Sequence, residues 1–300
     1  HLRFGPAPIR APYLIARANF VGCHQFRFLD QVDVLDRAAP GAALLLNCPH
    51  PPDRVWDALS RPVQQQILDK GILLYVVNAN RIAREAGLPG RINVVLQTCF
   101  FEITGVLPRD TAITRIKDAI AATYGVYGAD VVNREHLAVD RAVAGLHRVD
   151  VPAAVTATRD PLPLIPADAP QFVREVTAEL IAGRGDALPV SALPVDGTYP
   201  SGTTAYEKRN ISELVAQWEP DQCIQCGNCA FVCPHAVLRA KSYPDGALEG
   251  APDGFLSAPL NAAGLPSTRY TLQVYVEDCT GCGLCVEACP VKPIDQPSRR

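Results

Sequence analysis

Two runs of cysteines near the end of the 300-residue chain constrain its structure more than any other feature. Both runs have the spacing C-x2-C-x2-C-x3-C-P. The first contains Cys223, Cys226, Cys229 and Cys233, and the second contains Cys279, Cys282, Cys285 and Cys289. Proteins use this spacing to hold [4Fe–4S] clusters, because three thiolates at every third residue of a tight loop can face three corners of one cube. The spacing therefore predicts two cluster-binding loops.

The last cysteine of each run precedes a proline, and in two-cluster proteins that cysteine ligates the other cluster. We therefore expect two interleaved sets of ligands. One set is Cys223, Cys226, Cys229 and Cys289, and the other set is Cys279, Cys282, Cys285 and Cys233. This part of the chain would transfer electrons one at a time.

Zinc and disulfides are the alternative explanations for these cysteines. A structural zinc ion takes four ligands, usually from two separated C-x2-C pairs, and does not need a third cysteine at this spacing. A disulfide framework suits a small secreted domain, but no apolar signal segment opens this chain. Two [4Fe–4S] clusters account for the pattern better than either alternative.

Composition predicts a globular protein in a reducing compartment, the cytoplasm, because clusters on free thiolates are sensitive to oxidation. Hydrophobic residues make up 48% and charged residues 20% of the chain. The longest apolar stretches are too short to cross a membrane. The formal net charge is −3, and about −2 for each oxidised cluster with its thiolates would bring it to about −7. This acidic balance argues against a nucleic-acid partner.

The first part of the chain has the pattern of an α/β fold, a partial parallel sheet with helices on its faces. Three apolar runs of strand length show little alternation, as expected for strands buried on both faces: 18–23, 42–47 and 72–78. Helices are predicted between and after them, at 26–38, two within 51–70, 79–86, 92–104, 111–123 with Asp110 as N-cap, and 129–147.

The amino-acid composition changes after residue 150, where prolines recur and only 171–182 has a helical pattern. We expect three regions: an α/β domain at 1–160, an extended proline-rich connecting segment at 161–203, and an α+β ferredoxin-like domain at 204–300. This last domain carries an insertion around 243–268, predicted to be a surface loop. The charged residues Glu207, Lys208 and Arg209 would ordinarily be exposed to solvent.

Two further groups of polar residues are candidate sites. Arg91 and Asn93 precede or open an apolar helix, whose N-terminus could hold an anion such as a phosphate, or simply be capped for stability. His24, Asn47, His50, Asn78 and Asn80 follow predicted strands, at the sheet edge where ligands of open parallel sheets bind. Cys23, Cys48 and Cys99 have no metal-ligand spacing and are expected to be core residues.

The chain resembles the single-chain pyruvate:ferredoxin (flavodoxin) oxidoreductases over essentially all of its length. The residues that carry the resemblance are 1–6 with 8–10, 23–25, 91–93 with 97–101, 194–197, 207–211 and the two cysteine runs. The first part would correspond to the gamma subunit of multi-subunit relatives. Because the chain starts at His1 and has no methionine, we expect it to be a central fragment of a longer enzyme.

The resemblance implies oxidative decarboxylation of pyruvate to acetyl-CoA and CO2, an activity of the EC 1.2.7 type. It implies thiamine pyrophosphate, Mg2+ and a third [4Fe–4S] cluster in domains absent from this chain, with coenzyme A as co-substrate. Arg91 and Asn93 could contact coenzyme A or another domain. The partners would be ferredoxin or flavodoxin and the remaining domains, in a homodimer of the full-length protein.

This segment itself has no predicted catalytic residue and would relay electrons without decarboxylating anything. Two alternatives stay open: an oxidoreductase acting on another 2-oxoacid, and a stand-alone ferredoxin-type electron carrier.

Overall fold

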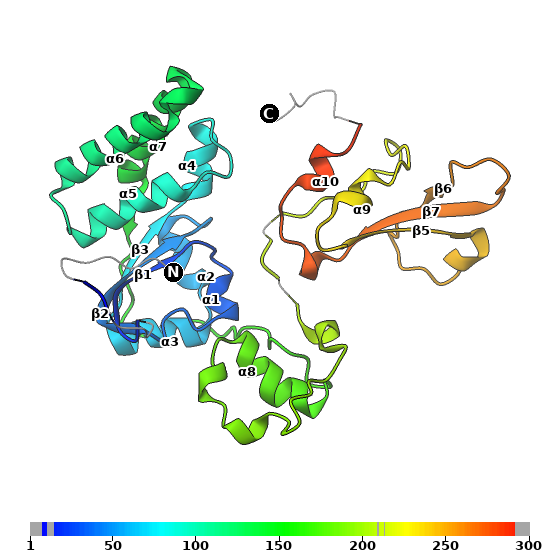
Figure 1. Ribbon diagram of the computed structural model, residues 1–300, viewed down its shortest axis with the longest axis horizontal. Coiled ribbons are helices and arrows are strands. Elements are labelled where there is room, and N and C mark those ends of the chain that lie inside the picture. Colours follow the sequence, from blue (N-terminus) through cyan, green and yellow to red (C-terminus); the bar gives the residue numbers. More distant parts are fainter. Residues whose placement is uncertain (1–7, 11–14, 209, 213, 292–300) are drawn as a thin grey trace. The chain divides into compact units, whose positions relative to one another are not determined.

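The computed structural model describes residues 8–10, 15–208, 210–212 and 214–291 (Figure 1). Residues 1–6 and Arg209, which contribute to the family resemblance, lie outside this range. The chain divides into two compact units, and each is described by itself. The first contains residues 1–163 and 179–188, and the second contains residues 164–178 and 189–300. The domain boundaries expected from the sequence stay predictions.

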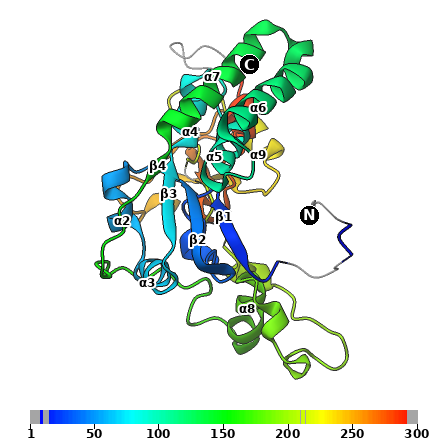
Figure 2. The same cartoon turned by 90° about the vertical axis from the view of Figure 1, so that its left-hand side faces the viewer.

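The first unit contains a four-stranded sheet in the order β1-β2-β3-β4 (Figure 2). β1, β2 and β3 are parallel, and β4 pairs antiparallel with β3. The strands are β1 (Ala18–Cys23), β2 (Ala38–Asn47), β3 (Leu73–Val77) and β4 (His147–Arg148). The predicted α/β fold and its three parallel strands are confirmed, and β4 was not predicted.

Two apolar cores cover opposite faces of this sheet. Leu44 and Leu46 of β2 pack with helices α1 to α3, whereas Leu45 between them packs with α4, α5 and α7. The helices are α1 (Phe28–Gln31), α2 (Val55–Ala58), α3 (Arg61–Lys70), α4 (Ala79–Glu85), α5 (Asn93–Thr104), α6 (Arg109–Tyr124) and α7 (Ala129–Gly145). Burial on both faces explains why the strands show no polar alternation.

Two helix predictions in this unit are wrong in detail. The helix predicted at 26–38 is reduced to α1, because β2 begins at Ala38 and includes Pro40 and Gly41, where its register with β1 shifts. Proline and glycine are tolerated in a strand at such an irregularity. Asp110 lies inside α6, whose N-cap is Pro108.

Residues 151–160 run along the first unit as extended chain. The side chain of Gln64, on α3, is fully buried, and its Oε1 accepts hydrogen bonds from the backbone N–H groups of Thr156 (2.8 Å) and Ala157 (2.9 Å). Arg159 pairs with Asp30 at 2.7 Å. The proline-rich composition thus corresponds to an extended segment that is held by specific polar contacts.

The helix predicted at 171–182 is partly a π-helix (Val173–Thr177) followed by α8 (Ala178–Ile181).

The second unit contains a three-stranded antiparallel sheet in the order β5-β7-β6 and two short helices (Figure 1). The elements are α9 (Asn228–Val232), β5 (Leu238–Pro244), β6 (Ala258–Pro259), β7 (Thr268–Val274) and α10 (Leu284–Glu287). The insertion predicted as a surface loop is therefore partly sheet, since β6 belongs to it. None of the helices in the described part of the chain is long and apolar enough to cross a membrane.

Candidate metal centre

The two cysteine runs fold in the same way. In each, a glycine between the second and third cysteines has left-handed backbone angles, with φ 77° and ψ −5° at Gly227 and φ 77° and ψ −4° at Gly283. Glycine adopts this conformation without steric cost because it has no Cβ. A short helix follows each glycine and carries the third cysteine: α9 carries Cys229, and α10 carries Cys285. The sequence repeat is thus a structural repeat.

Backbone N–H groups are directed at the cysteine sulfurs in both runs. Gln225 N–H donates to Cys223 Sγ at 3.4 Å, and Gly281 N–H donates to Cys279 Sγ at 3.4 Å. Val237 N–H donates to Cys233 Sγ, also at 3.4 Å. Such donors stabilise thiolates, the form in which cysteine binds metal.

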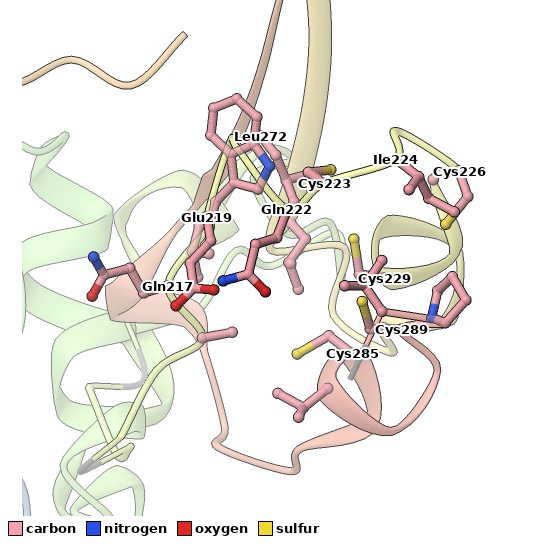
Figure 3. Close-up of a pocket in the computed structure, with 18 of the residues that line it drawn as sticks. Gln217, Glu219, Gln222, Cys223, Ile224, Cys226, Cys229, Leu272, Cys285 and Cys289 are labelled. Atoms are coloured by element: carbon pink, nitrogen blue, oxygen red, sulfur yellow. The ribbon is translucent and has the colours of Figure 1, made fainter. Parts of the chain in front are cut away.

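A pocket of about 280 Å³ lies beside the first run (Figure 3). Its lining includes cysteines from both runs and an apolar wall. The cysteines are Cys223, Cys226, Cys229, Cys285 and Cys289, and the wall includes Trp218, Tyr270 and Leu272. Four of these five cysteines are the set predicted for the first cluster. The pocket thus places Cys289 of the second run beside three cysteines of the first.

The chemistry of the pocket fits a cluster. The indole N–H of Trp218 is buried and has no hydrogen-bond partner among the described residues. N–H donors near cluster sulfurs are a recognised part of such sites. The described residues contain no group of three or more His, Cys, Asp or Glu close enough together to hold a single metal ion. A cube takes one thiolate at each of four separate iron atoms, so its ligands need not meet at one point.

Electrostatic interactions among the cysteines follow the same two groups. Burial raises the pKa of Cys229, and negative charge on Cys223 and Cys226 raises it further. Burial likewise raises the pKa of Cys285, with contributions from Cys282 and from Cys233 of the first run. Cys233 and Cys285, members of the second predicted set, are therefore close enough to interact across the two runs.

The other three cysteines are core residues of the first unit. Cys23 and Cys48 lie in the core on one face of the sheet, and Cys99 lies in the core on the other. Burial raises the pKa of Cys23 to about 11 and that of Cys99 to about 12, with Glu102 adding to the effect at Cys99. These thiols are protonated at neutral pH and inert.

Two of the polar residues at the strand ends have structural roles. Asn47 accepts a hydrogen bond from Ala79 N–H at 3.0 Å and donates one to the carbonyl oxygen of His24 at 3.0 Å. Asn78 caps α4 by accepting from Arg81 N–H at 2.9 Å. Contact of this edge with a ligand or partner domain stays a prediction.

Arg91 and Asn93 lie where α5 begins, but Arg91 faces a carboxylate. Its Nη1 is 4.0 Å from Oε1 of Glu135, a side chain on α7 that is only 1% exposed. The guanidinium also lies over the ring of Tyr124, 5.8 Å from its centroid. Arg91 therefore compensates a buried charge. Binding of coenzyme A or another domain by Arg91 and Asn93 stays a prediction.

The segment around Lys208 contacts the second cysteine run, which the sequence did not indicate. Lys208 Nζ lies 3.3 Å from Asp278 Oδ2 and 3.7 Å from Glu277 Oε2, directly before Cys279. Asn210 N–H donates to the carbonyl oxygen of Glu277 at 2.7 Å. Of the charged residues expected to be exposed, Glu207 is exposed and Arg209 lies outside the described residues. Lys208 is only partly exposed, because it pairs with acids 69 and 70 residues away that no local pattern links to it.

Comparison with known protein families assigns three parts of the chain. Residues 1–145 match the model of pyruvate ferredoxin/flavodoxin oxidoreductase, and residues 219–292 match a 4Fe-4S dicluster domain. Residues 158–212, between them, match a domain of unknown function called EKR. A pyruvate-flavodoxin oxidoreductase of Rhodospirillum rubrum is 53% identical over 97% of this chain and 24% of its own length. The chain belongs to the pyruvate ferredoxin/flavodoxin oxidoreductase family.

Other members of the pyruvate ferredoxin/flavodoxin oxidoreductase family match in the same way. A pyruvate-flavodoxin oxidoreductase of Nostoc is 46% identical over 99% of this chain and 25% of its own length. A pyruvate:ferredoxin oxidoreductase of Moorella thermoacetica is 39% identical over 97% of this chain and 25% of its own length. The chain thus spans about a quarter of the length of these relatives. Among solved structures, a pyruvate oxidoreductase subunit of Thermotoga maritima matches with a TM-score of 0.36 at 16% identity, covering 45% of this chain and 67% of that subunit.

Proposed function

We propose that this chain carries two [4Fe–4S] clusters and relays electrons as part of a pyruvate:ferredoxin (flavodoxin) oxidoreductase. The observation that carries the proposal is the pocket lined by Cys223, Cys226 and Cys229 together with Cys289 of the other run. A [4Fe–4S] cluster supplies reversible one-electron chemistry. The first cluster would be held by these four cysteines, and the second by Cys279, Cys282, Cys285 and Cys233.

The residues around the cysteines have separate tasks in this proposal. Backbone N–H groups of Gln225 and Gly281 hold the sulfurs in place and stabilise their negative charge. Trp218, Tyr270 and Leu272 limit the access of water to the pocket. Cys226 and Cys282 are exposed, so that each site has one edge at the surface of its unit, where an electron donor or acceptor can approach.

The activity of the whole enzyme is part of the same proposal. Its relatives bear the names of pyruvate oxidoreductases that use flavodoxin or ferredoxin. We place thiamine pyrophosphate, Mg2+, a third cluster and the decarboxylation in the part of the relatives that this chain does not match. Coenzyme A, a homodimeric assembly and a cytoplasmic location follow from the family resemblance and from the eight oxidation-sensitive cysteines.

Cysteine footprinting after a Cys289→Ala substitution tests the proposal. The protein is reconstituted with iron and sulfide without oxygen, treated with an alkylating reagent and analysed by mass spectrometry. Wild type should hold about eight irons and protect all eight cysteines. The variant should lose about half of its iron and expose Cys223, Cys226 and Cys229 to alkylation, while Cys279, Cys282 and Cys285 stay protected.

A Cys48→Ala substitution is the matched control, because it removes a buried cysteine that belongs to neither set. It should leave the iron content unchanged. Exposure of Cys279, Cys282 and Cys285 in the Cys289→Ala variant would show instead that each run binds its own cluster. Wild-type protein that binds zinc and no iron would contradict the proposal altogether.

A further inference from the structure

Among the positions at which the two cysteine runs differ, one lies two residues after the first cysteine, where the backbone N–H faces the cysteine sulfur. This position is Gln225 in the first run and Gly281 in the second. Both residues have left-handed backbone angles, with φ 59° at Gln225 and φ 67° at Gly281. Both donate their N–H to the preceding cysteine sulfur at 3.4 Å. Glycine is the ordinary residue for this conformation, and a residue with a side chain is uncommon there.

The side chain of Gln225 is held at both of its polar ends. Its Nε2 donates to the carbonyl oxygen of Pro259 at 2.8 Å, and its Oε1 accepts from Asn261 N–H at 2.8 Å. Pro259 belongs to β6, within the insertion that separates the two runs. A side chain of the first cluster loop thus forms a two-point clasp on the backbone of the insertion, which offsets the unfavourable conformation of Gln225.

The part of the insertion next to Pro259 is itself held by hydrogen bonds to β5 and β7. Ser257 Oγ accepts hydrogen bonds from Tyr243 Oη at 3.0 Å and from Arg269 Nε at 2.9 Å. Thr271 Oγ1 donates to the carbonyl oxygen of Leu256 at 2.8 Å. β6 also pairs with β7 through Ala258 and Pro259. The clasp therefore joins the first loop to an ordered part of the sheet.

The second loop has no such clasp, and a side chain at this position would require Ser212 to shift. A Cβ added to Gly281 would lie 2.5 Å from Ser212 Oγ, closer than atoms can approach without a shift. The second loop is instead flanked by the segment that contains Lys208 and Ser212. The two loops, alike in local conformation, are thus supported by different parts of the chain.

We propose that Gln225 is a positioning residue that fixes the first cluster loop to the insertion at 243–268. By doing so it orients its own N–H toward Cys223 Sγ and sets the reduction potential of the first cluster independently of the second. The inference rests on the proposed function, because it requires a cluster at Cys223. Hydrogen bonds to cluster sulfurs favour the more negative, reduced state, so a well-oriented N–H raises the potential.

Two substitutions test the inference in the reconstituted full chain. Gln225→Gly removes the clasp and suits the left-handed conformation, whereas Gln225→Ala removes the clasp and keeps a Cβ. In both variants the Asn261 amide should exchange with deuterium at least tenfold faster, as measured by mass spectrometry. In both, the midpoint potential of the first cluster should fall. At a fixed applied potential, the ratio of reduced to oxidised first cluster should be threefold to tenfold lower than in wild type. A tenfold lower ratio corresponds to a midpoint potential lower by 59 mV for one electron.

The first cluster's midpoint is identified as the one that a Cys223→Ala variant lacks in redox titrations followed by electron paramagnetic resonance. The control is Gln273→Ala, which removes an exposed glutamine from β7 and should change neither the exchange nor either potential. Unchanged Asn261 exchange, an unchanged first potential, or equal shifts of both potentials would overturn the inference. If the reconstituted wild-type protein held no iron, the proposed function would be refuted instead. The deuterium exchange of the Asn261 amide in the Gln225 variants would still test the clasp.

Discussion

At the scale of single residues, burial separates the eleven cysteines into two chemical classes. Cys23, Cys48 and Cys99 are at most 3% exposed and pack among apolar side chains. The eight cysteines of the two runs are partly or fully exposed, and several accept backbone N–H groups. Thiolates form where donors and solvent stabilise the charge, and thiols persist where neither is present. Only the second class is suited to ligating iron.

Glu135 is a residue whose burial has a cost. It is 1% exposed, its Oε2 has no hydrogen-bond partner among the described residues, and Arg91 is 4.0 Å from its Oε1. Burial raises the pKa of Glu135 above its ordinary value, and the charge of Arg91 opposes that shift. The folded state therefore holds the proton to a higher pH than the unfolded state does. Stability from this group is greatest below the ordinary pKa and is lost as pH rises through the folded-state pKa.

We predict that Glu135→Gln stabilises the first unit at pH 7 to 8, because the amide keeps the shape of the side chain without a buried charge. The melting temperature should rise by about 2–4 °C, as 1 kcal/mol gives in a unit of this size. The gain should shrink as pH falls through the raised pKa of Glu135, where the wild-type carboxyl takes up its proton. Thermal unfolding followed by circular dichroism across this pH range measures the difference.

The control for this prediction is Glu85→Gln, which removes a carboxylate that is 45% exposed and pairs with Arg81 and Arg141. It should give no gain at any pH, since its charge is solvated. A Glu135→Gln variant that is less stable than wild type at pH 8 would show that the charge is needed to hold Arg91.

At the scale of secondary-structure elements, the sequence predicted those strands, helices and loops that have a distinct local sequence pattern. The strands β1 and β3 were found because each is a continuous apolar run of strand length, and α5 because its apolar run is longer. The helix α7 was found because its apolar periodicity is sustained. The two cysteine runs were recognisable because their spacing itself encodes the loop. The helix prediction at 26–38 failed because β2 begins at Ala38 and contains Pro40 and Gly41, and its pairing with β1 decides the conformation there.

Contacts between distant segments could not be predicted in this way. Lys208 and Asp278 are 70 residues apart, and Gln225 and Pro259 are 34 apart. Nothing in the charge run at 207–209 or in the Gly-rich and Pro-rich insertion indicates a partner. Each contact depends on how the β5–β7 hairpin and the two loops meet, and this is a property of the folded unit.

The attachment of Lys208 leads to a prediction about the second loop. Lys208→Met keeps the apolar stem and removes the charge that pairs with Asp278 and Glu277 beside Cys279. The second cluster should be lost about two- to fivefold faster to a chelator, as expected for a partly exposed ion pair worth up to about 1 kcal/mol. Absorbance during anaerobic chelation gives the rate, and footprinting identifies which cysteines are released.

Lys241→Met is the matched control, because Lys241 is exposed on β5. It should leave both rates unchanged. If Lys208→Met releases the first set of cysteines as fast as the second, the segment stabilises the unit in general and does not act on the second loop.

At the scale of the whole molecule, the chain contains two compact units with different kinds of core. The first unit is an α/β layer structure with a core on each face of its sheet. The second is a smaller unit whose apolar core includes half-buried cysteines of both runs: Cys223, Cys229, Cys233, Cys279 and Cys285. Clusters at these cysteines would therefore be part of the core that stabilises the second unit, and their removal should unfold it while the first unit stays folded.

We predict that the isolated chain transfers electrons but does not consume pyruvate. Reconstituted protein reduced with dithionite should reduce added flavodoxin, because the proposed sites are complete within residues 223–289. Pyruvate with coenzyme A and thiamine pyrophosphate should give no acetyl-CoA above background, measured by chromatography. Removal of iron with a chelator is the control and should abolish the electron transfer. Acetyl-CoA formation by the chain alone would contradict the assignment of decarboxylation to other segments.

The unequal surroundings of positions 225 and 281 restrict how the two loops can diverge. Gln225→Gly needs no rearrangement, since glycine accepts the left-handed backbone. Gly281→Gln would collide with the Ser212 hydroxyl, which would have to move, and would place a side chain on a left-handed backbone. Mutational drift can thus make the first loop resemble the second without a clash, while the opposite change meets a clash and an unfavourable backbone conformation.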